Sequence, residues 1–183
     1  MNQNATTQSR RVPWRWLLIS LAVIVVDQLT KWLCVAFLKP VERVTLIPNF
    51  LKLTYVENRG AAFGSFSEHR WVFMVVSTVA IIAVTVYLLR FCEDNRLLRT
   101  ALTLIIGGGI GNMIDRIALG YVIDFIDFCG IWAYVFNGAD SAVCIGAGLM
   151  ILYVIMEIVK EFKAKKAPSD MADSDATDDR GDA

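Results

Sequence analysis

The sequence is poor in the side chains that most often build metal sites and nucleophilic catalytic sites. It has one histidine, His69, and four cysteines, none of which form a C-x-x-C pair. Zinc sites and disulfide frameworks need such residues at recognisable spacings. A Ser–His or Cys–His catalytic pair would depend on His69 alone, and no ligand spacing specifies an oxygen-only metal site. We therefore expect no metal, no cofactor and no disulfide.

An excess of charge of either sign is also missing. The 18 basic and 18 acidic side chains cancel, which argues against a nucleic-acid partner. The balance is uneven along the chain, because residues 168–183 hold six of the acids and one base, Arg180. This end segment is small and polar and has no apolar periodicity, so we expect it to be a disordered acidic tail.

Apolar residues, in contrast, make up 56% of the chain, above the roughly 45–50% of soluble domains. A bilayer core requires about 20 helical residues, and four stretches meet that requirement. They are residues 14–38, 71–89, 97–114 and 141–159. The first is too long for the roughly 7–15-residue core of a signal peptide, so we expect a retained anchor. The sequence predicts a membrane α-helical protein in which residues 1–167 form one polytopic domain.

The basic residues indicate how the spans are oriented. Three segments flanking the spans carry three or four Lys or Arg each, namely residues 10–15, 90–99 and 160–166. Such segments stay in the cytoplasm, so both termini are expected there. Segment 39–70, on the opposite side, also holds five bases, so the orientation depends on the agreement of the three inner segments.

Two outer segments have strand-like features. Residues 44–55 read VTLIPNFLKLTY, with β-branched and aromatic residues around a Pro-Asn turn, which indicates short strands or a hairpin. Residues 120–136 are apolar and aromatic but contain Asp124, Asp127 and Gly130. They are compatible with an additional strand or an interfacial helix.

Polar residues within the spans gather near the outer leaflet. At 1.5 Å per residue from the basic flanks, Asp27 lies about 18 Å into the bilayer and Asn112 about 20 Å. Arg116 and Asp140 reach about 26 and 30 Å. Charged groups at such depths are costly, so their convergence marks a structural cluster or a functional site.

Helical spacing pairs some of these residues. Asp27 and Lys31 are four residues apart and are expected to pair, with Lys31 close enough to the interface to snorkel. Asn112 and Arg116 share a face by the same spacing. Each pair can serve a structural role or border a site.

Gly107 and Gly111 form a G-x-x-x-G spacing, which lets membrane helices approach closely. The glycine run around them also leaves room for an extended ligand backbone, and both interpretations remain open.

Two aspartates stand in contrasting surroundings. Asn137 and Asp140 have the spacing of a capping box, and the start of a helix favours an ionised Asp140. Asp124 has apolar neighbours on both sides, which raise the pKa of a carboxyl group. If the 15 residues between them loop back, the two carboxyls can share a proton and perform acid and base steps together.

Five segments in order resemble the bacterial lipoprotein signal peptidase, or signal peptidase II, family. They are DQLTK at 27–31, ENRGAAFG at 57–64, GGGIGNMIDR at 107–116, VIDF at 122–125 and FNGAD at 136–140. The resemblance covers residues 14 to about 160. Gly109 and Gly138 depart slightly from the family pattern without removing a polar side chain.

The resemblance implies an aspartic endopeptidase of the bacterial inner membrane, active near the outer leaflet without a metal. Its substrates would be prolipoproteins carrying a diacylglyceryl-modified cysteine, cleaved on the N-terminal side of that cysteine among membrane lipids. It also implies a small extracytoplasmic β-sheet region and a short amphipathic segment over the cleft. Asp124 and Asp140 take the catalytic positions. The supporting or substrate-binding positions are Asp27, Lys31, Asn58, Gly60, Asn112, Arg116 and Asn137.

Two other classes of function remain as alternatives. In a small transporter, Asp27 and Lys31 would relay ions, although the cytoplasmic half of every span is apolar. In a membrane assembly factor the glycines would only pack helices, and Asp124 and Asp140 would be dispensable.

Overall fold

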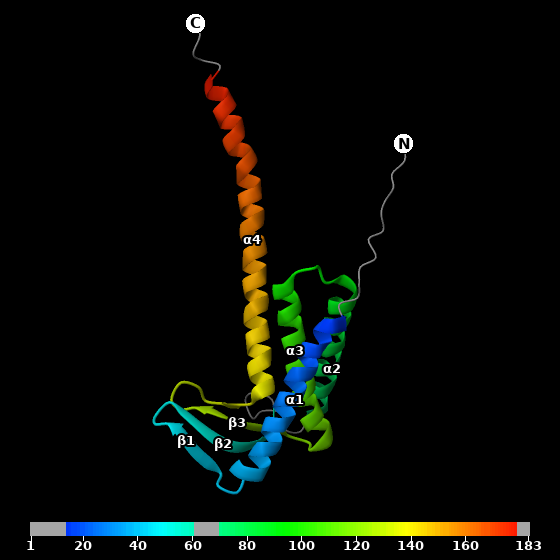
Figure 1. Ribbon diagram of the computed structural model, residues 1–183, viewed down its shortest axis with the longest axis vertical. Coiled ribbons are helices and arrows are strands. Elements are labelled where there is room, and N and C mark those ends of the chain that lie inside the picture. The colour runs from blue at the N-terminus through cyan, green and yellow to red at the C-terminus, as the bar shows by residue number, and fades with distance from the viewer. Residues whose placement is uncertain (1–13, 61–69, 179–183) are drawn as a thin grey trace.

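The computed structural model describes residues 14–60 and 70–178, which form a helical bundle with a small sheet at one end (Figure 1). The helices are α1 (Leu17–Leu33), α2 (Arg70–Val86), α3 (Arg96–Ala118) and α4 (Gly138–Asp178). A 3₁₀ turn, η1 (Trp14–Trp16), precedes α1, and π-helical turns η2 (Cys34–Leu38) and η4 (Tyr87–Phe91) extend α1 and α2. The strands are β1 (Arg43–Ile47), β2 (Leu51–Asn58), β3 (Val122–Phe128) and β4 (Val135–Phe136).

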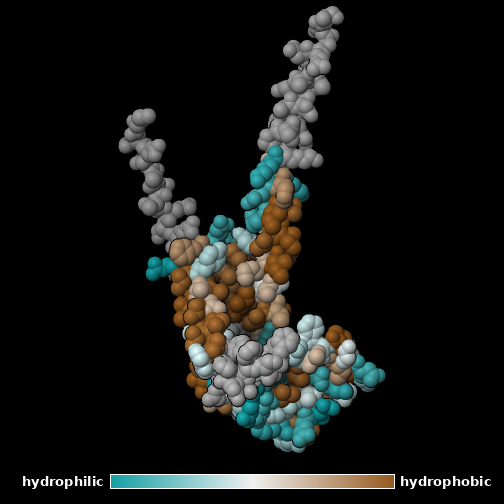
Figure 2. Space-filling view, turned by 180° about the vertical axis from the view of Figure 1, so that it is seen from behind, coloured by the Kyte–Doolittle hydropathy of each residue, from teal (hydrophilic) through white to brown (hydrophobic). Residues whose placement is uncertain are grey.

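The four helices are long and apolar enough to cross a membrane. Their candidate spans are Trp14–Leu38, Met74–Phe91, Arg96–Ala118 and Gly138–Lys165. Figure 2 shows apolar side chains covering the helices, with hydrophilic residues gathered on the sheet and on the part of α4 that precedes its grey end. The four predicted spans are confirmed, with the first matching in both bounds and the others shifted by one to six residues at each end.

Helix α3 is the centre of the bundle and packs against α1, α2 and α4. A Cβ atom at Gly107 would lie 2.8 Å from the Cβ of Val23 on α1, and one at Gly108 would overlap the carbonyl oxygen of Ala139 on α4. Close helix approach therefore accounts for these glycines, as the packing interpretation of the G-x-x-x-G spacing requires.

The sheet is antiparallel throughout, in the order β1-β2-β3-β4. Asn49 adopts a left-handed conformation (φ 59°) in the turn between β1 and β2, which confirms the predicted hairpin. Residues 120–136 supply strands β3 and β4, so the strand interpretation of that segment is correct and the interfacial helix is not. The amphipathic segment implied by the family resemblance has no counterpart within residues 14–60 and 70–178 and stays a prediction.

An apolar cluster fixes the sheet to the end of the first span. Cys34 and Leu38 of η2 are buried against Ile123 and Phe125 of β3. Because Asp124 lies between these two β3 residues, packing on one face of the strand sets the position of its carboxyl group.

Helix α4 continues beyond the predicted span and is helical to Asp178. Its backbone therefore enters segment 168–183, for which the composition predicts disorder, and its far part projects well past the ends of the other helices (Figure 1). The assignment of 1–167 as the domain and 168–183 as a disordered tail stays a prediction.

Candidate active site

Asp124 lies on β3 with its side chain buried, at 2% exposure. Its carboxylate accepts hydrogen bonds from Asn58 Nδ2 at 2.8 Å and from Asn137 Nδ2 at 2.7 Å. Burial raises the pKa of Asp124 to about 6, against the opposing effect of the hydrogen bond from Asn58. The predicted upward shift of its pKa is confirmed, and this carboxyl holds a proton more readily than an exposed aspartate does.

Asp140 lies in the first turn of α4 and is partly exposed. Its backbone N–H donates to Asn137 Oδ1 at 2.8 Å, while Asn137 N–H donates to Asp140 Oδ2 at 3.2 Å. These reciprocal bonds confirm the predicted capping box. Asn112 Nδ2 donates a second hydrogen bond to the carboxylate, to Oδ1 at 2.7 Å.

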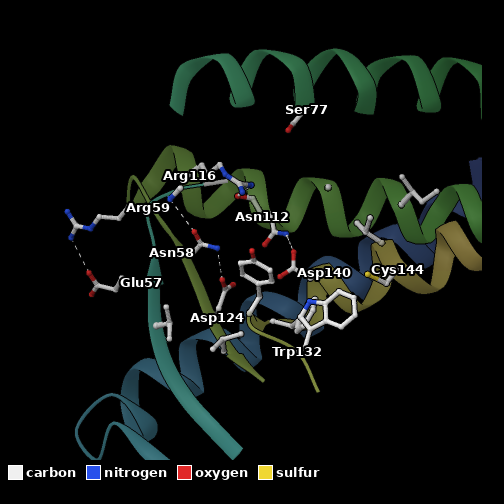
Figure 3. A pocket seen from close by; sticks show the side chains of 18 of the residues that line it. Glu57, Asn58, Arg59, Ser77, Asn112, Arg116, Asp124, Trp132, Asp140 and Cys144 are labelled. Atoms are coloured by element: carbon white, nitrogen blue, oxygen red, sulfur yellow. Dashed lines mark hydrogen bonds and ion pairs between the residues drawn. The ribbon is translucent and has the colours of Figure 1, made fainter. Parts of the chain in front are cut away.

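Asn137 connects the two aspartates. Its amide nitrogen donates to Asp124, while its amide oxygen and backbone N–H form the capping box with Asp140. Figure 3 shows both aspartates facing the same cavity, together with Asn58 and Asn112. Two carboxyls in unequal environments can divide acid and base roles between them.

A cavity of about 980 Å³ opens in front of the two aspartates. Polar residues around the two aspartates line one part of it, and apolar side chains of α2, α3, α4 and segment 132–136 line the rest. Residues lining that apolar part include Ala80, Ile81, Val84, Ile105, Gly109 and Val143. Such a shape suits an apolar chain that presents a polar group at one end.

Arg116 lies on the polar wall of the cavity. Within the described ranges its guanidinium makes one hydrogen bond, a long one of 3.4 Å to the backbone oxygen of Asn112, and no ion pair. Most of the donors of this guanidinium therefore have no partner among the described residues.

Asn58 ends β2 and Gly60 follows it at the rim of the cavity. Gly60 N–H donates to Asn58 Oδ1 at 3.1 Å, which leaves Asn58 Nδ2 directed at Asp124. The rest of this motif, residues 61–64, lies outside the described residues.

Asp27 and Lys31 form the predicted i,i+4 ion pair at 2.8 Å, with both side chains buried. The expectation that Lys31 snorkels to the interface is wrong. Its Nζ also contacts Asp115 Oδ2 at 3.0 Å and donates to Asn112 Oδ1 at 3.1 Å, and these partners hold it inside the bundle.

Asp115 and Gln28 contact the site, although neither is among the site residues predicted from the sequence. Gln28 Nε2 donates to Asp115 Oδ1 at 2.9 Å, and Asp115 Oδ2 accepts the backbone N–H of Ile123 at 3.1 Å. Both residues lie within the recognised motifs, and the presence of a carboxyl at membrane depth was the available signal for Asp115.

The structure also corrects the depth count. Asn112 and Asp140 were placed about 10 Å apart by the helical rise, yet their side chains share a hydrogen bond. The depth of Asp140 is counted from Lys160, which does not mark the end of the helix, because α4 continues to Asp178.

A metal site would need several ligands around one point. In the part of the chain that the structure describes, no three His, Cys, Asp or Glu side chains meet in this way.

Comparison with known proteins gives a consistent result. A family model described as "Signal peptidase (SPase) II" matches residues 19–156. The lipoprotein signal peptidase of Halalkalibacterium halodurans is 39% identical over 155 residues, 83% of this chain and 99% of that protein. That of Syntrophotalea carbinolica is 44% identical over 142 residues, 74% and 88% of the two chains. A solved bacterial membrane enzyme, obtained by the in meso method, matches with a TM-score of 0.72 at 32% identity, covering 79% of this chain and 89% of its own.

Proposed function

The chain belongs to the signal peptidase II family and is therefore a multi-pass membrane protease that removes signal peptides from prolipoproteins, and we propose that it is an aspartic endopeptidase that uses Asp124 and Asp140. The resemblance seen in the motifs is thereby confirmed, and the transporter and assembly-factor alternatives are not favoured. The observation that carries the aspartic mechanism is that Asn137 bonds to both carboxyls beside one cavity.

The two carboxyls take different roles in this proposal. Asp124 is buried and, with a pKa of about 6, is the acid. Asp140 is at a helix N-terminus and accepts hydrogen bonds from Asn112 and from the Asn137 backbone, so it is the ionised base.

The reaction begins when Asp140 removes a proton from a water molecule as the water oxygen attacks the scissile carbonyl carbon. Asp124 gives its proton to the carbonyl oxygen, which forms a tetrahedral diol. When the C–N bond breaks, Asp140 passes its proton to the leaving nitrogen, and a diol hydroxyl returns a proton to Asp124. The new carboxyl group belongs to the signal peptide and the new amine to the lipoprotein.

The proposed substrate is a prolipoprotein with a diacylglyceryl-modified cysteine, cleaved on the N-terminal side of that cysteine. The apolar part of the cavity is suited to the membrane-embedded part of such a molecule, and the Arg116 guanidinium is a donor for its backbone carbonyls. Asn58 and Gly60 supply the cavity rim beside Asp124.

We place the protein in the bacterial inner membrane, with the active site near the outer leaflet and both termini in the cytoplasm. The first residues of α1 and the far end of α4 lie at one end of the bundle and the sheet at the other, as this orientation requires (Figure 1). Membrane lipids surround the four spans in this arrangement.

The test uses purified protein and a diacylglyceryl-modified prolipopeptide. We expect Asp124→Asn and Asp140→Asn to reduce kcat about 10²–10⁴-fold, because each removes one proton-transfer step. Asp127→Asn, on the same strand as Asp124, is the matched control and should cleave normally. A normal rate in either active-site variant would exclude this catalytic pair.

Independence from metal ions is tested in the same assay. We expect cleavage to continue after dialysis against a chelator. Loss of activity that a divalent cation restores would contradict the proposal.

A further inference from the structure

Two carboxylates outside the proposed catalytic pair hold the backbone next to it. Asp27 Oδ1 accepts the N–H of Ala139 at 2.8 Å, and Asp115 Oδ2 accepts the N–H of Ile123 at 3.1 Å. Ala139 immediately precedes Asp140, and Ile123 immediately precedes Asp124. Each proposed catalytic aspartate is therefore attached to the helical bundle through the residue before it.

Lys31 joins these two carboxylates. Its ammonium group lies 2.8 Å from Asp27 Oδ2 and 3.0 Å from Asp115 Oδ2, and none of the three side chains is more than 3% exposed. Gln28 Nε2 also donates to Asp115 and, at 3.3 Å, to Asp27. A buried charge is stable only when it is paired, so the three groups are held together as a unit.

Lys31 also determines how Asn112 faces Asp140. Asn112 Oδ1 accepts hydrogen bonds from Lys31 at 3.1 Å and from Asn137 Nδ2 at 2.9 Å. With two donors directed at the oxygen, the amide nitrogen must point the other way, where it donates to Asp140 at 2.7 Å.

From this arrangement we propose that Asp27, Lys31 and Asp115 form a brace that sets the separation and orientation of the two catalytic carboxyls, with Asp115 as the positioning residue for Asp124. The inference rests on the proposed catalytic roles of Asp124 and Asp140.

The fold gives a reason for such a brace. Asp124 belongs to the sheet and Asp140 to α4, and these elements are connected in sequence by the short strand β4 and its flanking loops. The brace attaches both to α1 and α3, at the centre of the bundle. Misplacement of a catalytic group by about 1 Å can reduce a rate about 100-fold, so a common anchor has a direct effect on turnover.

The test compares two substitutions at Asp115 in the full-length purified chain. Asp115→Leu removes the acceptor for Ile123, and we expect kcat to fall about 100-fold with KM little changed. Asp115→Asn keeps an oxygen that can accept from Ile123 and Lys31, and it should lose less than about tenfold. The pH profile of kcat/KM should move in the Leu variant, because the carboxyl pair no longer has its native geometry.

A backbone substitution tests the same bond without altering any charge. Replacing the amide N–H of residue 123 by an ester oxygen removes the donor to Asp115 and leaves the brace intact. We expect a fall in kcat of about tenfold, close to the lower limit for one hydrogen bond to a charged group. The control is Asp127→Leu, which removes a carboxylate from the same strand, where it accepts the Thr54 hydroxyl at 3.0 Å, and it should leave kcat unchanged.

The outcomes separate the brace from the catalytic assignment. A normal kcat in the ester variant, or equal losses in Asp115→Asn and Asp115→Leu, would overturn the positioning role of Asp115. If Asp124→Asn retained activity, the catalytic pair itself would be wrong, whatever the Asp115 variants did.

Discussion

The brace and the cavity wall differ in how their charges are satisfied, although they meet on helix α3. In the brace, the ammonium group of Lys31 contacts two carboxylates and an amide oxygen, all buried. On the cavity wall, Arg116 makes one long hydrogen bond among residues 14–60 and 70–178, and Asp140 is partly exposed. The charges of the brace neutralise one another, whereas Arg116 and Asp140 line the cavity and have no ion-pair partner among the described residues.

The boundary between these regions lies between two consecutive residues of α3. Asp115 faces α1 and is buried, and Arg116 faces the cavity. Removing one partner of a buried ion pair leaves an unpaired charge, which costs about 3–5 kcal/mol, whereas a charge that remains solvated contributes little to stability. Substitutions in the brace should therefore lower stability, whereas substitutions on the cavity wall should lower activity with little effect on stability.

The largest effect is expected for Lys31→Met. This change leaves the Asp27 and Asp115 carboxylates buried without their cation, and we expect the free energy of unfolding to fall by about 3–5 kcal/mol. Unfolding in detergent with increasing denaturant measures the loss.

Arg116→Met is the matched comparison for Lys31→Met. It should change the free energy of unfolding by less than about 1 kcal/mol while reducing turnover of the lipopeptide substrate. Equal destabilisation by the two substitutions would show that the brace and the wall do not differ as described.

A smaller loss of stability is expected for Gly111→Ala. A Cβ atom there would lie 2.6 Å from Asp27 Oδ2 and 3.3 Å from the Cβ of Ala139, so the Asp27 carboxylate must move. Overpacking of this kind costs about 1–3 kcal/mol, measured again by unfolding in detergent.

Gly148→Ala is the control for this substitution, because a Cβ at that position meets nothing within 4 Å. It should be neutral or slightly stabilising, since alanine favours a helix more than glycine does. If both alanine variants unfolded alike, close packing around Asp27 would not be what limits residue 111.

Much of the fold could be predicted from local signals in the sequence. Hydrophobic length gave the four spans, the Pro-Asn turn gave the hairpin, and the Asn137–Asp140 spacing gave the capping box. Each of these features depends on residues close together in the chain. The family resemblance added the order of the motifs and so the two aspartates proposed for catalysis.

Contacts between distant segments could not be predicted in this way. Lys31 looked free to snorkel because only its own helix was considered, whereas its second carboxylate, Asp115, is contributed by α3. Asp115 and Arg116 are also adjacent charged residues of one motif, and the sequence does not show which of them is buried. Only the rotation of α3 against α1 shows that one is buried and the other lines the cavity.

The smallest expected effect concerns the cavity wall and is a change in how kcat/KM depends on pH. In the proposed mechanism Asp124 acts as the acid, so kcat/KM should fall as the pH rises through about 6, the pKa of this carboxyl. The pair titrates together, so the falling limb reports both carboxyls. Asn58 donates to the Asp124 carboxylate at 2.8 Å and thereby stabilises its ionised form.

Asn58→Ala should therefore raise the pKa of Asp124 and move the falling limb upward by about one to two units, since a hydrogen bond to a charged group contributes about 1.5–3 kcal/mol. Thr54→Val is the control, because it removes a similar hydrogen bond to Asp127 between the same two strands, outside the cavity. A profile of kcat/KM against pH for the three proteins measures both effects. A falling limb that Asn58→Ala left in place would contradict the role of Asp124 as the acid.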